Sequence, residues 1–229
     1  MGRQLVCMVS GPGLRGRMHK LAKVSIAALL AVASITAKPP VNPQSKITPE
    51  LIAFAKSLGD KNAPIIVEDF TDFQCPGCRI LFLNTTAKVI DDYVVSGKVY
   101  LVHHDFPLEG EHPYAREAAR WANAAALVGK FEKVEFALFT KQADWGADGK
   151  IEDVVASVLS PVDMKRVREF ANRPEIQEAI AQDITLGKER GVHSTPSLFV
   201  THKGQRVALP PGAISYSILK QYLDDLLKQ

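Results

Sequence analysis

The sequence predicts a single α/β domain in which a helical insertion separates a β-α-β half from a β-β-α half. Apolar, β-branched runs at residues 65–70 and 99–102 flank a helical pattern at residues 80–95, and this order implies a pair of parallel strands. Strand patterns return only after a long helical stretch at about residues 111–190. That stretch is therefore expected to be an insertion that leaves the sheet closed behind it.

A helix is expected to precede the first strand. Thr48 followed by Pro49 is typical of a helix N-cap and a first helical position, and Gly59 is expected to end the helix. Its apolar face is predicted to consist of Leu51, Phe54, Ala55 and Leu58. The domain is therefore expected to span residues 48–229, after a flexible, proline-containing lead-in at residues 38–47.

Helical patterns fill the insertion, and a hairpin and a helix close the chain. Ser160-Pro161 and Arg173-Pro174 mark two helix starts. The segments SLFV and QRVAL predict a β-hairpin. The side chains expected to face the core are Trp121, Trp145, Ile176, Ile180, Ile184, Leu219, Tyr222, Leu223 and Leu226.

The excess of basic residues lies at the N-terminus. The chain contains 28 lysines and arginines against 25 aspartates and glutamates, a formal charge of +3. Residues 1–37 hold five of the basic residues and no acidic one, which leaves a charge of −2 for residues 38–229. The positive balance therefore indicates no nucleic-acid partner. With 46% hydrophobic residues, the chain is typical of a globular protein that buries a core.

The N-terminal segment, residues 1–37, is predicted to be a signal peptide. A basic stretch precedes a short apolar run, which is followed by small residues and is too short for a comfortable membrane span. Cleavage is expected after Ala33 or Ala37, and an uncleaved anchor is the alternative. If translation starts at Met18, residues 1–17 are an over-called extension.

Export implies an oxidising compartment, in which a close pair of cysteines can persist as a disulfide. Cys7 is expected to leave with the leader, which leaves Cys75 and Cys78 with Pro76 and Gly77 between them. A disulfide across two residues closes too small a loop to stabilise the fold much. The remaining interpretations are a metal site and a pair that cycles between dithiol and disulfide.

The position of the pair favours redox chemistry. Cys75 lies where a strand gives way to a helix, and Pro76 suits the first helical turn because its missing N–H is not needed there. The free N–H groups and the positive end of the helix dipole are then expected to lower the pKa of Cys75. Cys78, one turn on, can close the disulfide, and Gly77 is expected to let another chain approach.

A metal site is the alternative interpretation. A structural zinc site needs four protein ligands, and the exported chain has no second cysteine pair. His103 or His104 could complete a copper-carrier-like site with the two cysteines. Adjacent histidines on a strand point to opposite faces, however, so both are not expected to bind one ion. We therefore expect no bound metal and no cofactor beyond the redox-active Cys75–Cys78 disulfide.

Three segments resemble the DsbA-like branch of the thioredoxin superfamily. NAPIIVEDFTDFQCPGC is similar to the family's approach to its cysteine pair, and GVHSTPSLFV to its second motif, Gly-Val-x-x-Thr-Pro before a strand. FPLEGEHPYAREAARWANAA resembles the start of the family's helical insertion. The chain departs from the family in its Pro-Gly dipeptide and in Glu68-Asp69, where one acid followed by Phe is common. The resemblance covers residues 48–229 and implies a thioredoxin fold with a helical insertion.

The resemblance also implies roles for five residues. Cys75 would be the exposed nucleophile, and Cys78 the more buried resolving cysteine. Thr195-Pro196 would be a cis peptide that lies against the disulfide, with the backbone of Thr195 pairing with a bound polypeptide. Asp69 matches the family's buried acid, which can accept the proton of Cys78.

Two further charged residues compete for roles near the pair. Glu68 is adjacent to Asp69, so the strand register decides which carboxylate faces the cysteines. Arg79 is expected either to help stabilise the thiolate or to be a solvated first-turn arginine.

The resemblance implies an exported thiol–disulfide oxidoreductase that acts as an oxidase on reduced, newly secreted proteins. A membrane quinone-linked thiol oxidase is the implied partner for re-oxidation. A reductase or isomerase of the same fold is the alternative within this class. Isomerases of the superfamily usually carry a dimerisation module, for which the short lead-in leaves no room, so a monomer is expected.

Overall fold

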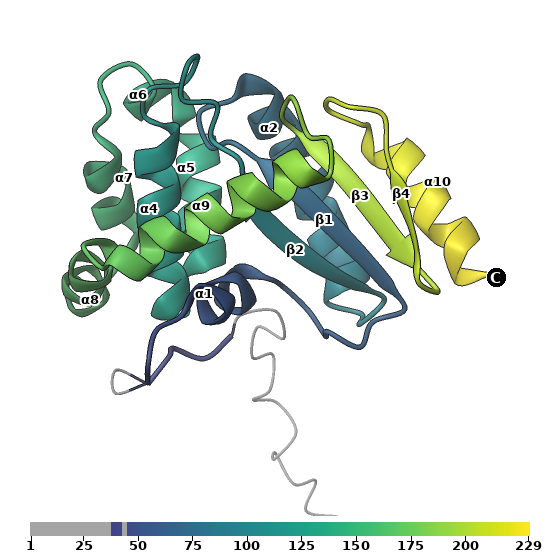
Figure 1. Cartoon of the computed structure of the whole chain (residues 1–229), viewed down its shortest axis with the longest axis horizontal. Coiled ribbons are helices and arrows are strands. Elements are labelled where there is room, and N and C mark those ends of the chain that lie inside the picture. Colours follow the sequence, from purple (N-terminus) through teal and green to yellow (C-terminus); the bar gives the residue numbers. More distant parts are fainter. Residues whose placement is uncertain (1–37, 43–44) are drawn as a thin grey trace, which may run out of the picture. The chain divides into compact units, whose positions relative to one another are not determined.

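The structure is a computed structural model that describes residues 38–42 and 45–229. The predicted signal peptide and Cys7 lie outside the described residues and stay predictions. The described part contains a four-stranded sheet with the strand order β2-β1-β3-β4 (Figure 1). Within it, no helix has the length and apolar character needed to cross a membrane.

The β-α-β half has the predicted order. β1 (Ile65–Thr71) runs parallel to β2 (Val99–Asp105). The chain between the two strands is helical, with π-helical turns written as η: α2 (Pro76–Leu81), η1 (Phe82–Thr86), α3 (Ala87–Val89) and η2 (Ile90–Val94). β2 continues three residues beyond its predicted end, because the three polar residues there are buried and bound to charged partners.

The β-β-α half closes the sheet. β3 (Ser197–His202) pairs antiparallel with β1, and β4 (Gln205–Ala208) pairs antiparallel with β3. Lys203 and Gly204 form the turn between them with φ angles of 48° and 77°, the positive values that a tight hairpin requires. α10 (Tyr216–Leu227) buries Leu219 and Leu223, as predicted.

The insertion consists of six helices between β2 and β3. They are α4 (Ala115–Leu127), α5 (Phe131–Thr140), α6 (Gln142–Trp145), α7 (Ile151–Val158), α8 (Pro161–Ala171) and α9 (Pro174–Glu189). Ser160 caps α8, and a proline opens both α8 and α9, as predicted. Trp121 and Trp145 are buried in a core formed mainly by these helices. The predicted fold class, a thioredoxin fold with a helical insertion, is confirmed.

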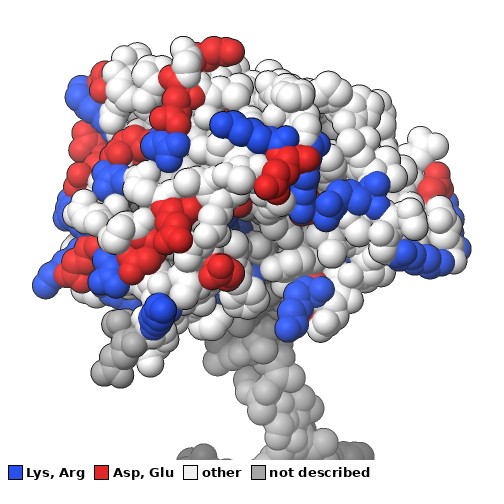
Figure 2. All heavy atoms as spheres, viewed as in Figure 1, with Lys and Arg blue, Asp and Glu red and all other residues white. Residues whose placement is uncertain are grey.

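Helices cover both faces of the sheet. The helical segment from α2 to η2 packs with α10 on the face that carries Val67, Leu101 and Val200. α9 crosses the other face (Figure 1), close enough for a Cβ atom on Gly187 to lie 2.6 Å from the ring of Phe106. Glycine at this position therefore permits the close packing of α9. Acidic and basic side chains are interspersed over the surface of α8 and α9 (Figure 2).

The first helix differs from its prediction. α1 (Pro49–Lys56) is capped by Thr48, whose hydroxyl accepts a hydrogen bond from the N–H of Leu51. The predicted apolar face is correct at Ala55 and Leu58, which are buried, but wrong at Phe54, which is 48% exposed. Lys56, in contrast, is only 1% exposed. The helix buries Ile52 and Ala55 beside this lysine. A charged residue lies inside because two carboxylates receive it, as described below.

The segment before α1 makes specific contacts. The N–H of Val41 donates to the carbonyl of Leu127 over 2.9 Å, and the Lys38 ammonium donates to the carbonyl of Ser57 over 2.8 Å. Ile47 is buried at 5% exposure. The described part of the predicted lead-in is thus attached to the domain.

Candidate active site

The cysteine pair lies at the junction of β1 and α2. Cys75 is the N-cap of α2, and Pro76 is its first residue. Both cysteines are free thiols in the structure; Cys75 is 8% exposed and Cys78 is 1% exposed. The chain therefore presents Cys75 toward the surface and keeps Cys78 behind it.

The two thiols differ in acidity. A hydrogen bond from Cys78 is the main cause that lowers the pKa of Cys75 to about 5, and the backbone N–H groups of Gly77 and Cys78 add to it against the effect of burial. Burial raises the pKa of Cys78 well above its usual value, and the charges of Cys75 and Asp69 add to this rise. At neutral pH, Cys75 is therefore a thiolate and Cys78 is a thiol.

The Thr195–Pro196 segment lies against the cysteine pair, although it is more than a hundred residues away in the sequence. The peptide bond between the two residues is cis. The carbonyl of Thr195 lies 3.4 Å from the Cys75 sulfur and accepts a hydrogen bond from it when Cys75 is a thiol. Figure 1 shows α2 beginning at the end of the sheet where β3 also begins.

Gly77 also matters for packing within this chain. A Cβ atom on Gly77 would lie 3.3 Å from Cδ of Pro196 and 3.6 Å from the Cys75 sulfur. The missing side chain thus lets the Pro196 ring approach the pair within this chain.

Polar side chains fix the loop that precedes Cys75. Asp72 is buried and accepts hydrogen bonds from the N–H groups of Gln74 and Cys75, over 2.7 and 3.2 Å. Its other oxygen accepts from His112 over 2.8 Å. The amide of Gln142, on α6, donates to the carbonyl of Cys75 over 3.0 Å. The insertion therefore helps to hold the cysteine loop in place.

The register of β1 separates the two neighbouring acids. Asp69 pairs with His103 on the face that carries α2, and its charge acts on Cys78. Glu68 points to the other face, where hydrogen bonds from His104 and Arg190 outweigh burial and lower its pKa to about 2. Asp69 is therefore the carboxyl group that lies beneath the cysteines.

The environment of Asp69 disfavours its charge. The side chain is buried, and its Oδ1 atom has no hydrogen-bond partner among the described residues. Burial raises the pKa of Asp69 to about 7. Such a carboxyl group can both accept and release a proton near neutral pH.

The structure shows a buried ionic network that the sequence did not reveal. His103 bonds to Glu135 on α5 over 3.0 Å and to Asp105 over 3.1 Å. Lys56 bridges Asp105 and Asp183, which links α1, β2 and α9. On the other face, Asp183 also bonds to His104 over 2.8 Å. The polar run His103-His104-Asp105 at the end of a strand was the one sign of this network in the sequence. It could not identify the partners, which lie far away along the chain.

Arg79, His103 and His104 each have partners away from the cysteine sulfurs. The Arg79 guanidinium donates to the carbonyl of Phe139 over 3.0 Å, a contact with α5 that neither sequence-based alternative included. His103 and His104 lie on opposite faces of the sheet, as the strand pattern predicted, and each is held by carboxylates. Within the described residues, no group of three histidine, cysteine or acidic side chains is placed to hold a metal ion.

The raised pKa of Asp69 gives a pH-dependent prediction. The pKa of Asp69 is about 7 in the folded state and 3.8 in the unfolded state, so the folded protein holds the proton more tightly. The free energy of unfolding therefore falls as the pH rises from 3.8 to about 7. We therefore expect Asp69→Asn to stabilise the oxidised protein at pH 8, and much less at pH 4. The difference should be roughly 2 kcal/mol or more, since one pKa unit corresponds to about 1.4 kcal/mol. Urea unfolding at both values measures it.

The exposed Asp91 on η2 offers a control. Asp91→Asn is expected to show no comparable difference between the two pH values. Equal effects of Asp69→Asn at pH 4 and pH 8 would contradict the raised pKa.

Comparisons with known proteins agree with this geometry. A thioredoxin family model matches residues 55–225. The probable disulfide bond formation protein D of Bacillus cereus is 26% identical over 187 residues, which cover 77% of this chain and 84% of that protein. A thioredoxin-like oxidoreductase from Silicibacter pomeroyi is 28% identical, with a TM-score of 0.58, and the match covers 76% and 92% of the two chains. Wolbachia pipientis alpha-DsbA1 shares the fold at 20% identity, with a TM-score of 0.62 and coverage of 75% and 89%.

The fold and the acidic, strand-end cysteine define a protein thiol–disulfide oxidoreductase of the DsbA-like kind. The chain belongs to the thioredoxin family.

Proposed function

We propose that this oxidoreductase is exported and acts as an oxidase, which donates the Cys75–Cys78 disulfide to reduced secreted polypeptides. The observation that carries this proposal is the low pKa of Cys75, about 5, beside a buried thiol and Thr195. A stabilised thiolate favours the reduced form of the enzyme, and this makes its disulfide a stronger oxidant.

The proposed reaction consists of two exchanges. A client thiolate attacks Cys75 of the oxidised enzyme, the Cys75–Cys78 bond breaks, and Cys78 leaves as a thiolate that takes a proton from Asp69. A second client thiolate then attacks the client sulfur of the mixed disulfide and displaces Cys75 as a thiolate. The client gains one disulfide and the enzyme gains two electrons. The low pKa of Cys75 makes it a good leaving group in the second exchange.

The backbone of Thr195 is positioned to hold the client. Its carbonyl is 3.4 Å from the reacting sulfur, so a polypeptide that pairs with this backbone would place its own cysteine near Cys75. Backbone pairing does not depend on the side chains of the partner. We therefore propose unfolded or extended clients rather than one particular protein.

Re-oxidation needs an acceptor for the two electrons. We propose a membrane quinone-linked thiol oxidase as this partner, with the enzyme acting as a monomer. Export is supported by the leader pattern and by the chemistry, since a disulfide donor works in an oxidising compartment.

The equilibrium redox potential of the pair tests the direction of electron flow. Potentials of such pairs range from about −270 mV for a reductant to about −120 mV for a strong oxidant. We expect a value near the oxidising end when the purified protein is equilibrated with glutathione buffers. A value near the thioredoxin end would contradict the oxidase proposal and favour a reductase.

A further inference from the structure

We propose that Glu135, on helix α5 of the insertion, carries the proton between the buried Asp69 and an open groove on the surface. The inference rests on the proposed role of Asp69 as the proton acceptor of Cys78. Glu135 acts through Asp69 and does not touch the reacting sulfurs.

Asp69 needs such a connection because it is closed off from solvent. It is 7% exposed and lies on the covered face of β1. Asp69 gives a proton to Cys78 in one half of the cycle and takes one up in the other, and its protonation state can follow the pH of the medium only if it exchanges protons with solvent. The route has to pass through the groups that surround this carboxyl group.

A small cavity joins Asp69 to Glu135. Its volume is about 10 Å³, which is close to the space that one water molecule occupies. Glu135 is 5% exposed, and its charge acts on Asp69. The cavity is lined by Lys56, Leu58, Asp69, Thr86, Leu101, His103, Phe131 and Glu135. Both carboxyl groups line this cavity, which therefore offers the path for a proton between them.

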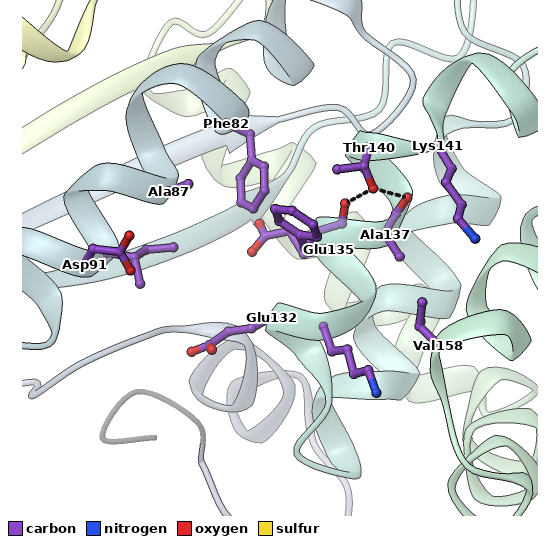
Figure 3. Close-up of a pocket in the computed structure, with 12 residues that line it drawn as sticks. Phe82, Ala87, Asp91, Glu132, Glu135, Ala137, Thr140, Lys141 and Val158 are labelled. Carbon is purple, nitrogen blue, oxygen red and sulfur yellow. Dashed lines mark hydrogen bonds between the residues drawn. The ribbon is translucent and has the colours of Figure 1, made fainter. Parts of the chain in front are cut away.

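A larger groove begins on the other side of Glu135. It lies between α5 and the helical segment that follows the cysteines, has a volume of about 630 Å³, and is lined by Phe82, Phe136 and Lys141 among others. Figure 3 shows Glu135 beside Phe82 in the wall of this groove. Of the described residues, Glu135 is the one that lines both the cavity and the groove.

A second surface groove also meets the cavity, but the side chains that the two share cannot carry a proton. The residues shared by that groove and the cavity are Leu58 and Phe131. Both side chains are apolar. The geometry therefore favours the path through Glu135.

Neighbouring charges hold Glu135 in this position. His103 donates to Oε1 of Glu135 over 3.0 Å and also bonds to Asp105. These hydrogen bonds outweigh burial and raise the pKa of His103 to about 9, so the imidazole is a cation that fixes the carboxylate. The titratable groups that face Asp69 from the surrounding elements are Lys56, Cys78, His103 and Glu135, and the charge of His104 acts on Asp69 from the other face of the sheet.

When Cys78 resolves a mixed disulfide, its proton leaves the site in three transfers. Cys78 transfers its proton to the Asp69 carboxylate and attacks the sulfur of Cys75, which releases the partner thiolate. Asp69 passes the proton to the Glu135 carboxylate, and Glu135 releases it to water in the groove. In the opposite direction, the departing Cys78 thiolate receives a proton along the same path.

The reaction of the reduced protein with 5,5′-dithiobis(2-nitrobenzoate) separates the relevant step. In a Cys7→Ser background, which removes the third thiol of the chain, Cys75 attacks first and releases one coloured thiolate, and Cys78 then releases the second. Glu135→Gln is expected to slow the second phase by about tenfold, which is less than the roughly 10²–10⁴-fold that a direct general acid or base contributes, because Glu135 acts through Asp69. The first phase should be unchanged. The solvent deuterium isotope effect on the second phase should increase, because proton movement then limits the rate.

Matched variants make the outcomes distinguishable. Glu132→Gln removes a charge from the same helix and the same groove but not from the cavity, and both phases should remain normal. Glu135→Asp keeps a carboxyl group and should retain part of the second-phase rate. This variant also tests the relay if Glu135→Gln folds poorly. An unchanged second phase in Glu135→Gln would overturn the relay.

The rate of the second phase should also be measured against pH. If Glu135→Gln shifted the pH at which this rate rises but left its maximum unchanged, the relay would be overturned, since Glu135 would then act on Asp69 only through its charge. Asp69→Asn distinguishes the two proposals. If it leaves the second phase unchanged, the proton-acceptor role of Asp69 fails as well. If Asp69→Asn slows the second phase and Glu135→Gln does not, only the relay fails.

Discussion

Replacing Cys75 by serine is expected to reduce thiol–disulfide exchange to the uncatalysed background. A serine hydroxyl does not form disulfides, and Cys78 cannot replace the lost nucleophile because it is 1% exposed and its pKa is well above the usual value. Insulin reduction and oxidation of a reduced peptide both measure the loss. A Cys7→Ser background removes the third thiol of the chain from these assays.

Cys78→Ser is the matched comparison, because it also leaves one cysteine in the pair. It keeps the exposed nucleophile and removes the resolving thiol, so mixed disulfides with clients should accumulate at Cys75. Non-reducing gels and mass spectrometry detect them. If Cys75→Ser trapped clients and Cys78→Ser did not, the two roles would be reversed.

Local patterns were sufficient to predict the architecture. Strands β1 and β2 begin with apolar runs, α8 begins with a proline after the N-cap Ser160, and α9 begins with Pro174. The cysteine pair was visible because Cys75 and Cys78 are adjacent on one helical turn. Each of these features depends on residues close together in the chain.

The charged interior could not be predicted in the same way. The sequence pattern placed Phe54 inside and gave no reason to bury Lys56, because its partners lie 49 and 127 residues away. Nothing in the sequence analysis singled out Glu135, yet this residue is buried and bonds to His103 in the core. The choice between Glu68 and Asp69 likewise required the register of β1. Such positions depend on tertiary contacts, which periodicity does not encode.

The buried lysine of this network gives the second large effect. Lys56 is 1% exposed, and its ammonium bonds to Asp105 and Asp183. Burial favours a neutral lysine, but the charges of the two aspartates outweigh it and raise the pKa of Lys56. The aspartate pKa values are lowered in return, with the charge of Lys56 outweighing burial. Lys56, Asp105 and Asp183 are therefore all charged at neutral pH.

The sign of each shift fixes the pH window of this stabilisation. A lysine with a raised pKa contributes fully below 10.5 and loses its contribution as the pH rises through the folded value. An aspartate with a lowered pKa contributes fully above 3.8 and loses its contribution as the pH falls through the folded value. The contribution of the ion pairs that Lys56 makes with Asp105 and Asp183 should therefore be nearly constant between about pH 5 and pH 9.

Lys56→Met is accordingly expected to lower the free energy of unfolding at pH 7 by about 3–5 kcal/mol, because it leaves two buried carboxylates without their shared cation. Urea unfolding of the oxidised protein measures the loss, and Lys61→Met, in the exposed loop after α1, should change it by less than about 0.5 kcal/mol. Adding Asp105→Asn and Asp183→Asn to Lys56→Met should recover part of the stability, since the unpaired charges are then removed. Recovery should be incomplete, because Asp105 also bonds to His103 and Asp183 to His104. If Lys56→Met cost no more than Lys61→Met, the buried lysine would not be the group that joins α1, β2 and α9.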